Sequence, residues 1–117
     1  MSAADRLARL KKSRTAAIAV QDEMDRRNDS DPRPSNVLKR APILRRAAAE
    51  IADLDLMIND LEGDPQPIML DPSRLTALDR LAEKLNAAIV RDALVGVALD
   101  NVTHVLEAAA EVREVLA

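Results

Sequence analysis

The chain has 117 residues, enough for one domain or for a small domain with an arm, and it contains no Cys, Phe, Tyr or Trp. The lack of cysteine excludes disulfides, thiolate metal ligands and thiol catalysis. The net charge of −3 conceals a division between a basic segment, residues 1–46 at +6, and an acidic remainder at −9, which favours attraction between copies or a basic arm facing an anionic partner.

The apolar content is aliphatic, with 21 Ala, 16 Leu and only two Gly in the chain. Aromatic side chains normally supply the largest single buried areas, so burial here must come from many aliphatic contacts. Abundant helix formers favour long helices packed side by side. We therefore expect an all-α protein: a helical hairpin or small bundle of long antiparallel helices, with a basic N-terminal helix on a flexible linker.

Residues 1–28 are expected to form the basic N-terminal helix. Its apolar positions lie near heptad spacing, but Arg14 and Gln21 fall on the same line and weaken the stripe. We expect this helix to be only partly buried unless a partner covers it. The apolar positions are Leu7, Leu10, Ala17 and Met24.

Residues 29–41 are expected to be the flexible linker, because residues 28–36 have no apolar side chain and include two prolines. Pro42 lacks a backbone donor and disfavours a helical conformation at the residue before it. The main second helix is therefore expected to begin at Pro42. The chain would then divide into the N-terminal helix, this linker and an oligomerising region, residues 42–117.

Residues 43–62 carry a regular apolar stripe, which Gly63 and the prolines after it bring to an end. Asp71 followed by Pro72 is a start signal for the next helix. We expect residues 43–62 to pack as a hairpin against residues 72–99. The expected hairpin core is Leu44, Ile51, Leu54, Ile58, Leu75, Leu78, Leu85 and Ile89.

The segment from Ala87 to Leu99 is almost free of charge, which indicates a helix buried on all sides. A buried strand is the alternative interpretation of its apolar run at residues 93–99. The pattern leaves open whether residues 72–117 form one helix or two. Heptad spacing then resumes, and we expect a protein interface with a second copy or a larger partner at Val102, Leu106, Val112 and Leu116.

Residues suited to catalysis or metal binding are few. His104 is the only histidine; with Glu107 at i+3 it supplies two metal ligands where zinc needs more. The spacing around Gly63 does not fit a calcium loop, and two glycines cannot build a phosphate loop. We therefore expect no enzyme, no metal site and no cofactor. The acidic cluster considered for calcium is Asp53, Asp55, Asp60, Glu62 and Asp64.

Two basic clusters make nucleic acid a possible partner, since dense cations neutralise phosphates without reading sequence. Stacking on single-stranded bases is excluded by the lack of aromatic side chains. The competing interpretation pairs these cations with the acidic half of a neighbouring subunit. The candidate phosphate-binding residues are Arg6, Arg9, Lys11, Lys12, Arg14, Lys39, Arg40, Arg45 and Arg46.

Residues 68–82 resemble the strand and first helix of a ribbon-helix-helix repressor, and residues 88–94 are similar to the second helix of that family. The likeness covers about 30 residues. The chain departs from the pattern where polar residues should alternate along the DNA-reading strand, because it has prolines at positions 65 and 67. The turn expected around Asn86 also lacks a glycine and a capping serine.

These patterns predict a non-enzymatic assembly or adaptor subunit that acts through helix–helix contacts as a coiled-coil-like homo-oligomer. It could belong to a larger particle such as a phage virion. The first alternative is a DNA-binding oligomer, for example a packaging or regulatory factor; the second is a small inhibitor or antitoxin. No signal-peptide stretch, membrane span or interfacial helix pattern is present, so we expect the cytoplasm, or a particle assembled there, and no membrane partner.

Overall fold

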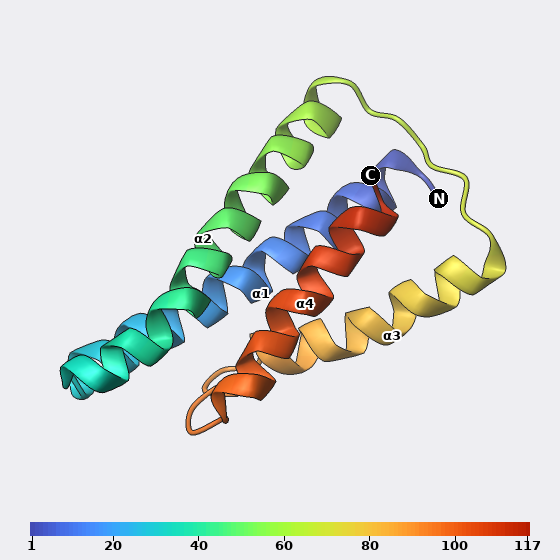
Figure 1. Cartoon of the computed structure of the whole chain (residues 1–117). Helices are drawn as coiled ribbons and strands as arrows, with labels where there is room; N and C mark the ends of the chain where they lie inside the picture. The colour runs from blue at the N-terminus through green and yellow to red at the C-terminus, as the bar shows by residue number, and fades with distance from the viewer.

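The computed structural model describes residues 1–117 and contains four α-helices and no strand, which confirms the expected all-α class. In chain order the helices are α1 (Ala3–Ser30), α2 (Pro34–Gly63), α3 (Pro72–Ile89) and α4 (Leu99–Val115). They form an elongated bundle of 47 × 27 × 21 Å. Figure 1 shows α1 and α4 lying between α2 on one side and α3 on the other.

Helix α1 is the centre of the bundle. It contacts each of the other three helices, whereas α2 and α3 do not contact each other. The expected hairpin of residues 43–62 against residues 72–99 is therefore wrong, and the long hairpin is formed by α1 and α2. The buried side of α1 includes Ser13, whose hydroxyl donates a hydrogen bond to the carbonyl oxygen of Arg9, 3.1 Å away. The buried residues of α1 are Leu10, Ser13, Ala16, Ala17, Val20, Glu23 and Met24.

The flexible linker expected at residues 29–41 is also wrong, because only residues 31–33 lie between α1 and α2. Pro34 occupies the first turn of α2, where its missing N–H costs nothing. Arg40 holds the turn together: its guanidinium donates to the carbonyl oxygens of Arg27 and Asp31 and to the side-chain oxygen of Asn28. The N-terminal helix is thus a fixed part of the core.

Pro42 lies inside α2 and does not begin it. Its ring is exposed, and the carbonyl oxygen of Leu38, four residues earlier, is the group that loses a helical donor. Leu38 is itself 71% exposed, so water can take the place of that donor. A proline on the outer side of a surface helix is therefore tolerated here.

The connection between α2 and α3, residues 64–71, is extended and is fixed to both ends of the chain. The N-terminal ammonium group of Met1 donates to the carbonyl oxygen of Ile68 at 2.8 Å, and the backbone N–H of Ile68 donates to the carbonyl oxygen of Met1 at 3.0 Å. Arg6 donates to the carbonyl oxygens of Gln66 and Leu116. This connection carries the chain across the bundle, which explains why α3 packs far from α2.

Helix α3 begins as expected, with Asp71 as the N-cap accepting from the backbone N–H of Arg74 at 2.9 Å and Pro72 in the first turn. The helix expected at residues 87–99 is wrong, because residues 90–98 form successive turns in which Asp92 (φ 60°) and Gly96 (φ 74°) adopt left-handed conformations. Residues 72–117 therefore contain two helices. The lack of a strand and of a helix at residues 90–94 removes the likeness to a ribbon-helix-helix arrangement.

The core has two parts along the bundle axis. The larger part holds Leu54 and Leu78 among 12 buried residues, and the smaller part holds Val20 and Val102 among nine. Of the expected hairpin core, half is buried, namely Leu54, Ile58, Leu78 and Leu85. The others are partly buried, except Leu75, which is 38% exposed.

Candidate functional site

The four side chains expected to form a protein interface lie inside the protein's own core. Helix α4 packs against α1, α2 and α3, and its stripe is between 0% and 2% exposed. The interface expected through these side chains is therefore wrong, because α1, taken from the sequence as a separate arm, covers them. The four residues are Val102, Leu106, Val112 and Leu116.

Most basic residues of α1 are paired with acidic residues of the same chain. Arg9 contacts Asp79 on α3 at 2.9 Å, and Lys11 contacts Glu62 on α2 at 3.1 Å. Arg14 donates to Asp55, Arg6 binds backbone carbonyl groups, and Lys12 has no ion pair. The opposite charges of the two halves thus meet inside one chain.

The second basic cluster, formed by Lys39, Arg40, Arg45 and Arg46, is also partly paired within the chain. Arg40 is 9% exposed and fixes the turn between α1 and α2, and Arg46 lies 3.7 Å from Glu107 on α4. Lys39 and Arg45 are exposed on α2 without an ion pair. Of the nine candidate phosphate-binding residues, only these two and Lys12 have no intramolecular partner, and they lie on two different helices. No continuous phosphate-binding track results.

Two buried carboxylates accept hydrogen bonds from arginines: Glu50 joins α2 to α4, whereas Glu23 is paired within α1. Glu50 on α2 accepts two hydrogen bonds from Arg113 on α4, of 2.7 and 3.1 Å, and this bidentate contact raises the pKa of Arg113. Glu23 accepts hydrogen bonds from Arg26 and Arg27. These bonds, chiefly the one from Arg26, lower the pKa of Glu23, although burial alone would raise it. No buried polar side-chain atom lacks a partner, so these charges belong to the architecture of the bundle.

The residues considered for metal binding do not converge. His104 is exposed and lines a shallow groove of about 230 Å³ between α3 and α4, with Glu107, Glu111 and Lys84. No group of three or more His, Cys, Asp or Glu side chains is placed to hold a metal ion. The residues of the acidic cluster project to different sides of α2; Asp55 and Glu62 face cations of α1.

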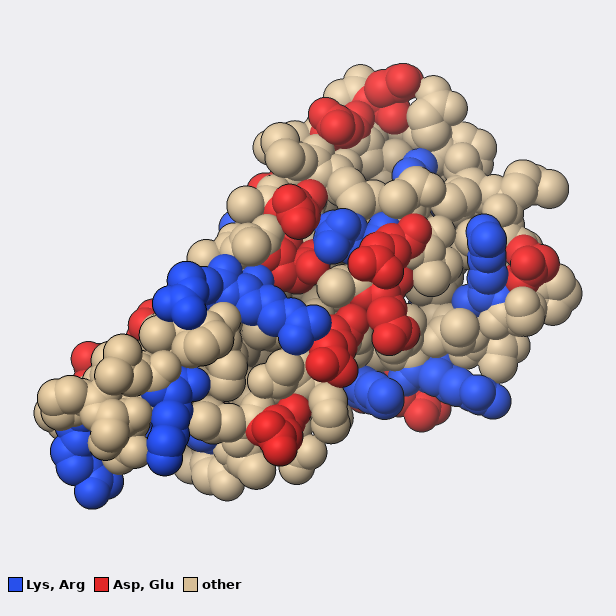
Figure 2. All heavy atoms as spheres, viewed as in Figure 1, with Lys and Arg blue, Asp and Glu red and all other residues tan.

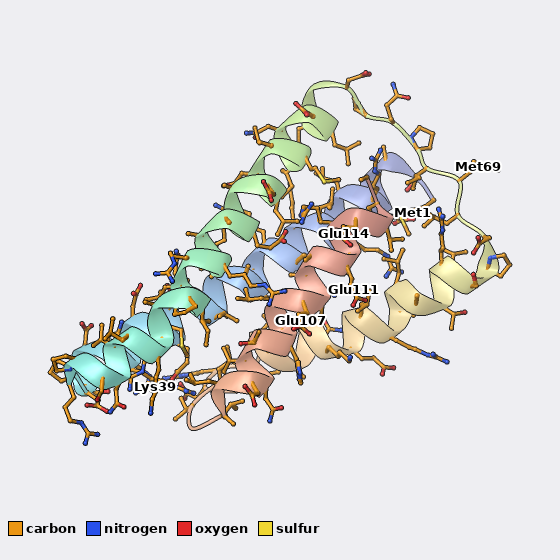
Figure 3. The ribbon with its side chains drawn as sticks, in the orientation of Figure 1. Met1, Lys39, Met69, Glu107, Glu111 and Glu114 are labelled. Carbon is orange, nitrogen blue, oxygen red and sulfur yellow. The ribbon has the colours of Figure 1, made fainter.

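Helix α4 presents an acidic ridge of Glu107, Glu111 and Glu114, which point toward the viewer in Figure 3. Figure 2 shows this acidic band across the middle of the molecule with basic side chains on both sides. The largest groove, about 590 Å³, lies at one end of the bundle between α1 and α2, where Arg6 and Asp60 line it with Leu10 and Met57. Arg6 lies at the edge of this groove and donates hydrogen bonds to the carbonyl oxygens of Gln66 and Leu116.

The outer face of α2 is the one extended helix face that combines exposed leucines with regular spacing. Leu38 and Leu56 are 71% and 65% exposed. They are 18 residues apart, which is five turns of an α-helix, so they point to the same side at a separation of about 27 Å. We define the outer face of α2 as Leu38, Pro42, Arg45, Ala49, Ala52, Leu56, Asn59 and Gly63, all of which are exposed.

The residues of the outer face follow one another at intervals of four and three, the spacing of a helix-packing seam. Helix α2 therefore has two stripes: a buried one against α1 and α4, which contains Leu54 and Ile58, and this exposed one. Sequence reasoning missed the second stripe because it assigned residues 29–41 to a linker. The signal was present in the spacing of the two leucines.

The other exposed apolar residues do not share one face. Met69, 95% exposed, lies in the connection before α3 and is labelled in Figure 3. Val90 and Val95 are 65% and 52% exposed in the turns between α3 and α4. Single exposed apolar side chains are common on protein surfaces and need no partner to explain them.

Comparison with known proteins gives no match to a protein-family model, to a curated protein or to a solved structure. None of the four helices is sufficiently long and apolar to cross a membrane.

Proposed function

We propose that the protein is a non-enzymatic assembly or adaptor subunit that binds protein through the outer face of α2. The observation that carries this proposal is the exposure of Leu38 and Leu56 on one side of a long helix, with Ala49 and Ala52 between them. Covering a fully exposed leucine contributes about 1.5–3 kcal/mol. Alanines at the centre let a second helix approach to an axial distance near 8 Å. The surface is thus suited to another helix.

The polar residues of the same face fit this use. Arg45 stands between the leucines without an ion pair, so its aliphatic stem can cover an apolar neighbour while its guanidinium stays in water. Asn59 and Gly63 continue the seam toward the end of the helix without adding charge. A helical partner would meet a narrow apolar strip with charges along its borders, as in coiled coils.

The two alternatives have less support. A DNA-binding oligomer needs its cations on one surface, and six of the nine candidate residues already bind groups of this chain. An inhibitor or antitoxin would be favoured by an N-terminal helix that folds only with a partner. Helix α1 is instead the centre of the fold.

Photo-crosslinking in the cells that produce the protein tests the proposal. A photoreactive amino acid at Ala52, on the outer face of α2, is expected to give a discrete covalent adduct with a protein. The same amino acid at Ala87, exposed on α3, is the matched control and is expected to give none. No adduct from position 52, or equal adducts from both positions, would contradict the proposal.

A further inference from the structure

The outer face of α2 is bordered by four charged residues at seven-residue intervals: Lys39, Arg46, Asp53 and Asp60. All four are exposed, and each comes directly after a residue of the outer face, namely residues 38, 45, 52 and 59. The first two are positive and the last two are negative. This order opposes the helix dipole, which favours acidic residues at the beginning of a helix and basic residues at its end. The helix dipole therefore does not explain the pattern, and for Lys39 and Asp60 no ion pair within the chain explains it either, whereas Arg46 and Asp53 have partners on α4.

An antiparallel copy of α2 explains it. If Ala49 lies opposite Ala52 of a second copy, residues of the seam face each other when their numbers add to 101. The border residues come one position after seam residues 38, 45, 52 and 59, and so lie along one edge of the seam. In an antiparallel coiled coil this edge of one helix lies beside the same edge of the other helix. Border residues therefore meet when their numbers add to 99. Lys39 thus faces Asp60, and Arg46 faces Asp53. Twofold symmetry repeats both pairs.

The seam itself is compatible with this arrangement. Leu56 meets the stem of Arg45, and Leu38 meets Gly63, so each large side chain lies opposite a flexible or small one. The two central layers contain alanine alone and bring the helix axes together. A parallel copy would instead place Arg45 against Arg45 and the acidic ends of both helices side by side. Charge therefore selects the antiparallel orientation.

We infer that the partner of the outer face of α2 is a second copy of this chain, bound antiparallel about a twofold axis near residues 50 and 51. The inference rests on the proposed function and names its partner. Two intramolecular contacts give way at small cost: Arg46 lies 3.7 Å from Glu107 at the surface, and exposed Asp53 lies 4.0 Å from Arg113, which keeps its closer contact with Glu50.

The dimer is expected to be weak and dependent on concentration. The strip from Leu38 to Gly63 is about 38 Å long and about 10 Å wide, so the two copies together would bury on the order of 800 Å². Stable specific interfaces bury about 1,200–2,000 Å². Dissociation during dilution is therefore expected, and salt should weaken the dimer because its orientation depends on exposed charges.

Charge reversal with complementation tests the inference. The variant K39E/R46E has an all-negative border, and D53K/D60K has an all-positive border. Each variant alone is expected to remain at the chain mass of 12.8 kDa, whereas the wild type approaches twice that mass with rising concentration. An equal mixture of the two variants is expected to dimerise again. Sedimentation equilibrium with interference optics measures this, since the chain lacks Tyr and Trp.

The control matched to K39E/R46E is R80E/K84E on α3, which makes the same change in net charge at two exposed residues that form no ion pair. It is expected to dimerise like the wild type, and all variants are expected to keep their helical circular dichroism. A wild type that stays at the chain mass at millimolar concentration, or a mixture that fails to dimerise, would overturn the inference. If photo-crosslinking at Ala52 then gives an adduct of another mass, the proposed function stands with a different protein partner.

Discussion

Replacing Leu54 with aspartate is expected to unfold the chain or to lower its melting temperature by about 15 °C or more. Leu54 is 0% exposed and belongs to the larger part of the core. Removing a buried leucine side chain typically costs about 2–5 kcal/mol. The carboxylate adds the cost of a buried charge with no partner. Thermal unfolding followed by circular dichroism at 222 nm measures the effect.

The matched control is Leu56→Asp, two residues further along the same helix. Leu56 is 65% exposed, so aspartate there reaches water and is expected to change monomer stability by about 0.5 kcal/mol or less. Dilute samples keep the comparison free of self-association. Equal melting temperatures for the two variants would contradict the assignment of a buried and an exposed stripe to α2.

The second large effect is expected from Arg113→Ala, which removes the partner of a buried carboxylate. Glu50 has a side chain that is 7% exposed and accepts both hydrogen bonds of Arg113. Breaking a buried ion pair costs about 3–5 kcal/mol. Because the side chain of Arg113 is 23% exposed, we expect a smaller loss, about 2–3 kcal/mol. Urea unfolding followed by circular dichroism gives the value.

The comparison variant is Arg9→Ala, since its partner Asp79 has a side chain that is 70% exposed and needs no counter-charge, so the pair is worth about 0.5 kcal/mol or less. Combining Arg113→Met with Glu50→Met removes both charges and is expected to recover much of the lost stability. If Arg113→Ala were no more destabilising than Arg9→Ala, the contact between α2 and α4 would not be a buried ion pair.

The secondary structure was largely predictable from the sequence because its signals are local. Asp71 and Pro72 start α3, and Gly63 with the prolines after it ends α2, as expected. Pro42 was misleading because its effect depends on exposure, which only the folded chain determines. The apolar run at residues 93–99 predicted a helix, but left-handed conformations at Asp92 and Gly96 turn the chain instead.

The arrangement of the helices was not predictable in the same way. The stripe chosen for α1 contained Arg14, whereas the buried stripe runs through Ser13, a small polar residue that bonds its own helix backbone. Because Arg9 pairs with Asp79, 70 residues away, the position of α1 depends on contacts that no local pattern contains. The interpretation of the N-terminal helix as a separate arm assumed that its cations have no acidic partner in the same chain.

The candidate site was hidden by one local error. Assigning residues 29–41 to a linker separated Leu38 from Leu56 and left the second stripe of α2 without its first turn. Once α2 begins at Pro34, the spacing of both leucines and of the charged border can be obtained from the sequence alone. The expected interface on α4 failed for the opposite reason, because an apolar stripe does not indicate whether its partner belongs to the same chain.

Cysteine pairing across the proposed twofold axis tests directly whether two copies of α2 meet antiparallel. The chain has no cysteine of its own, so Ala49→Cys and Ala52→Cys can be made separately and mixed. The antiparallel seam predicts that oxidation of the mixture gives a disulfide between positions 49 and 52 in higher yield than either variant gives alone. Ala87→Cys on α3 is the control for random collision. A mixture that crosslinks no better than this control would show that the outer faces of two copies do not meet.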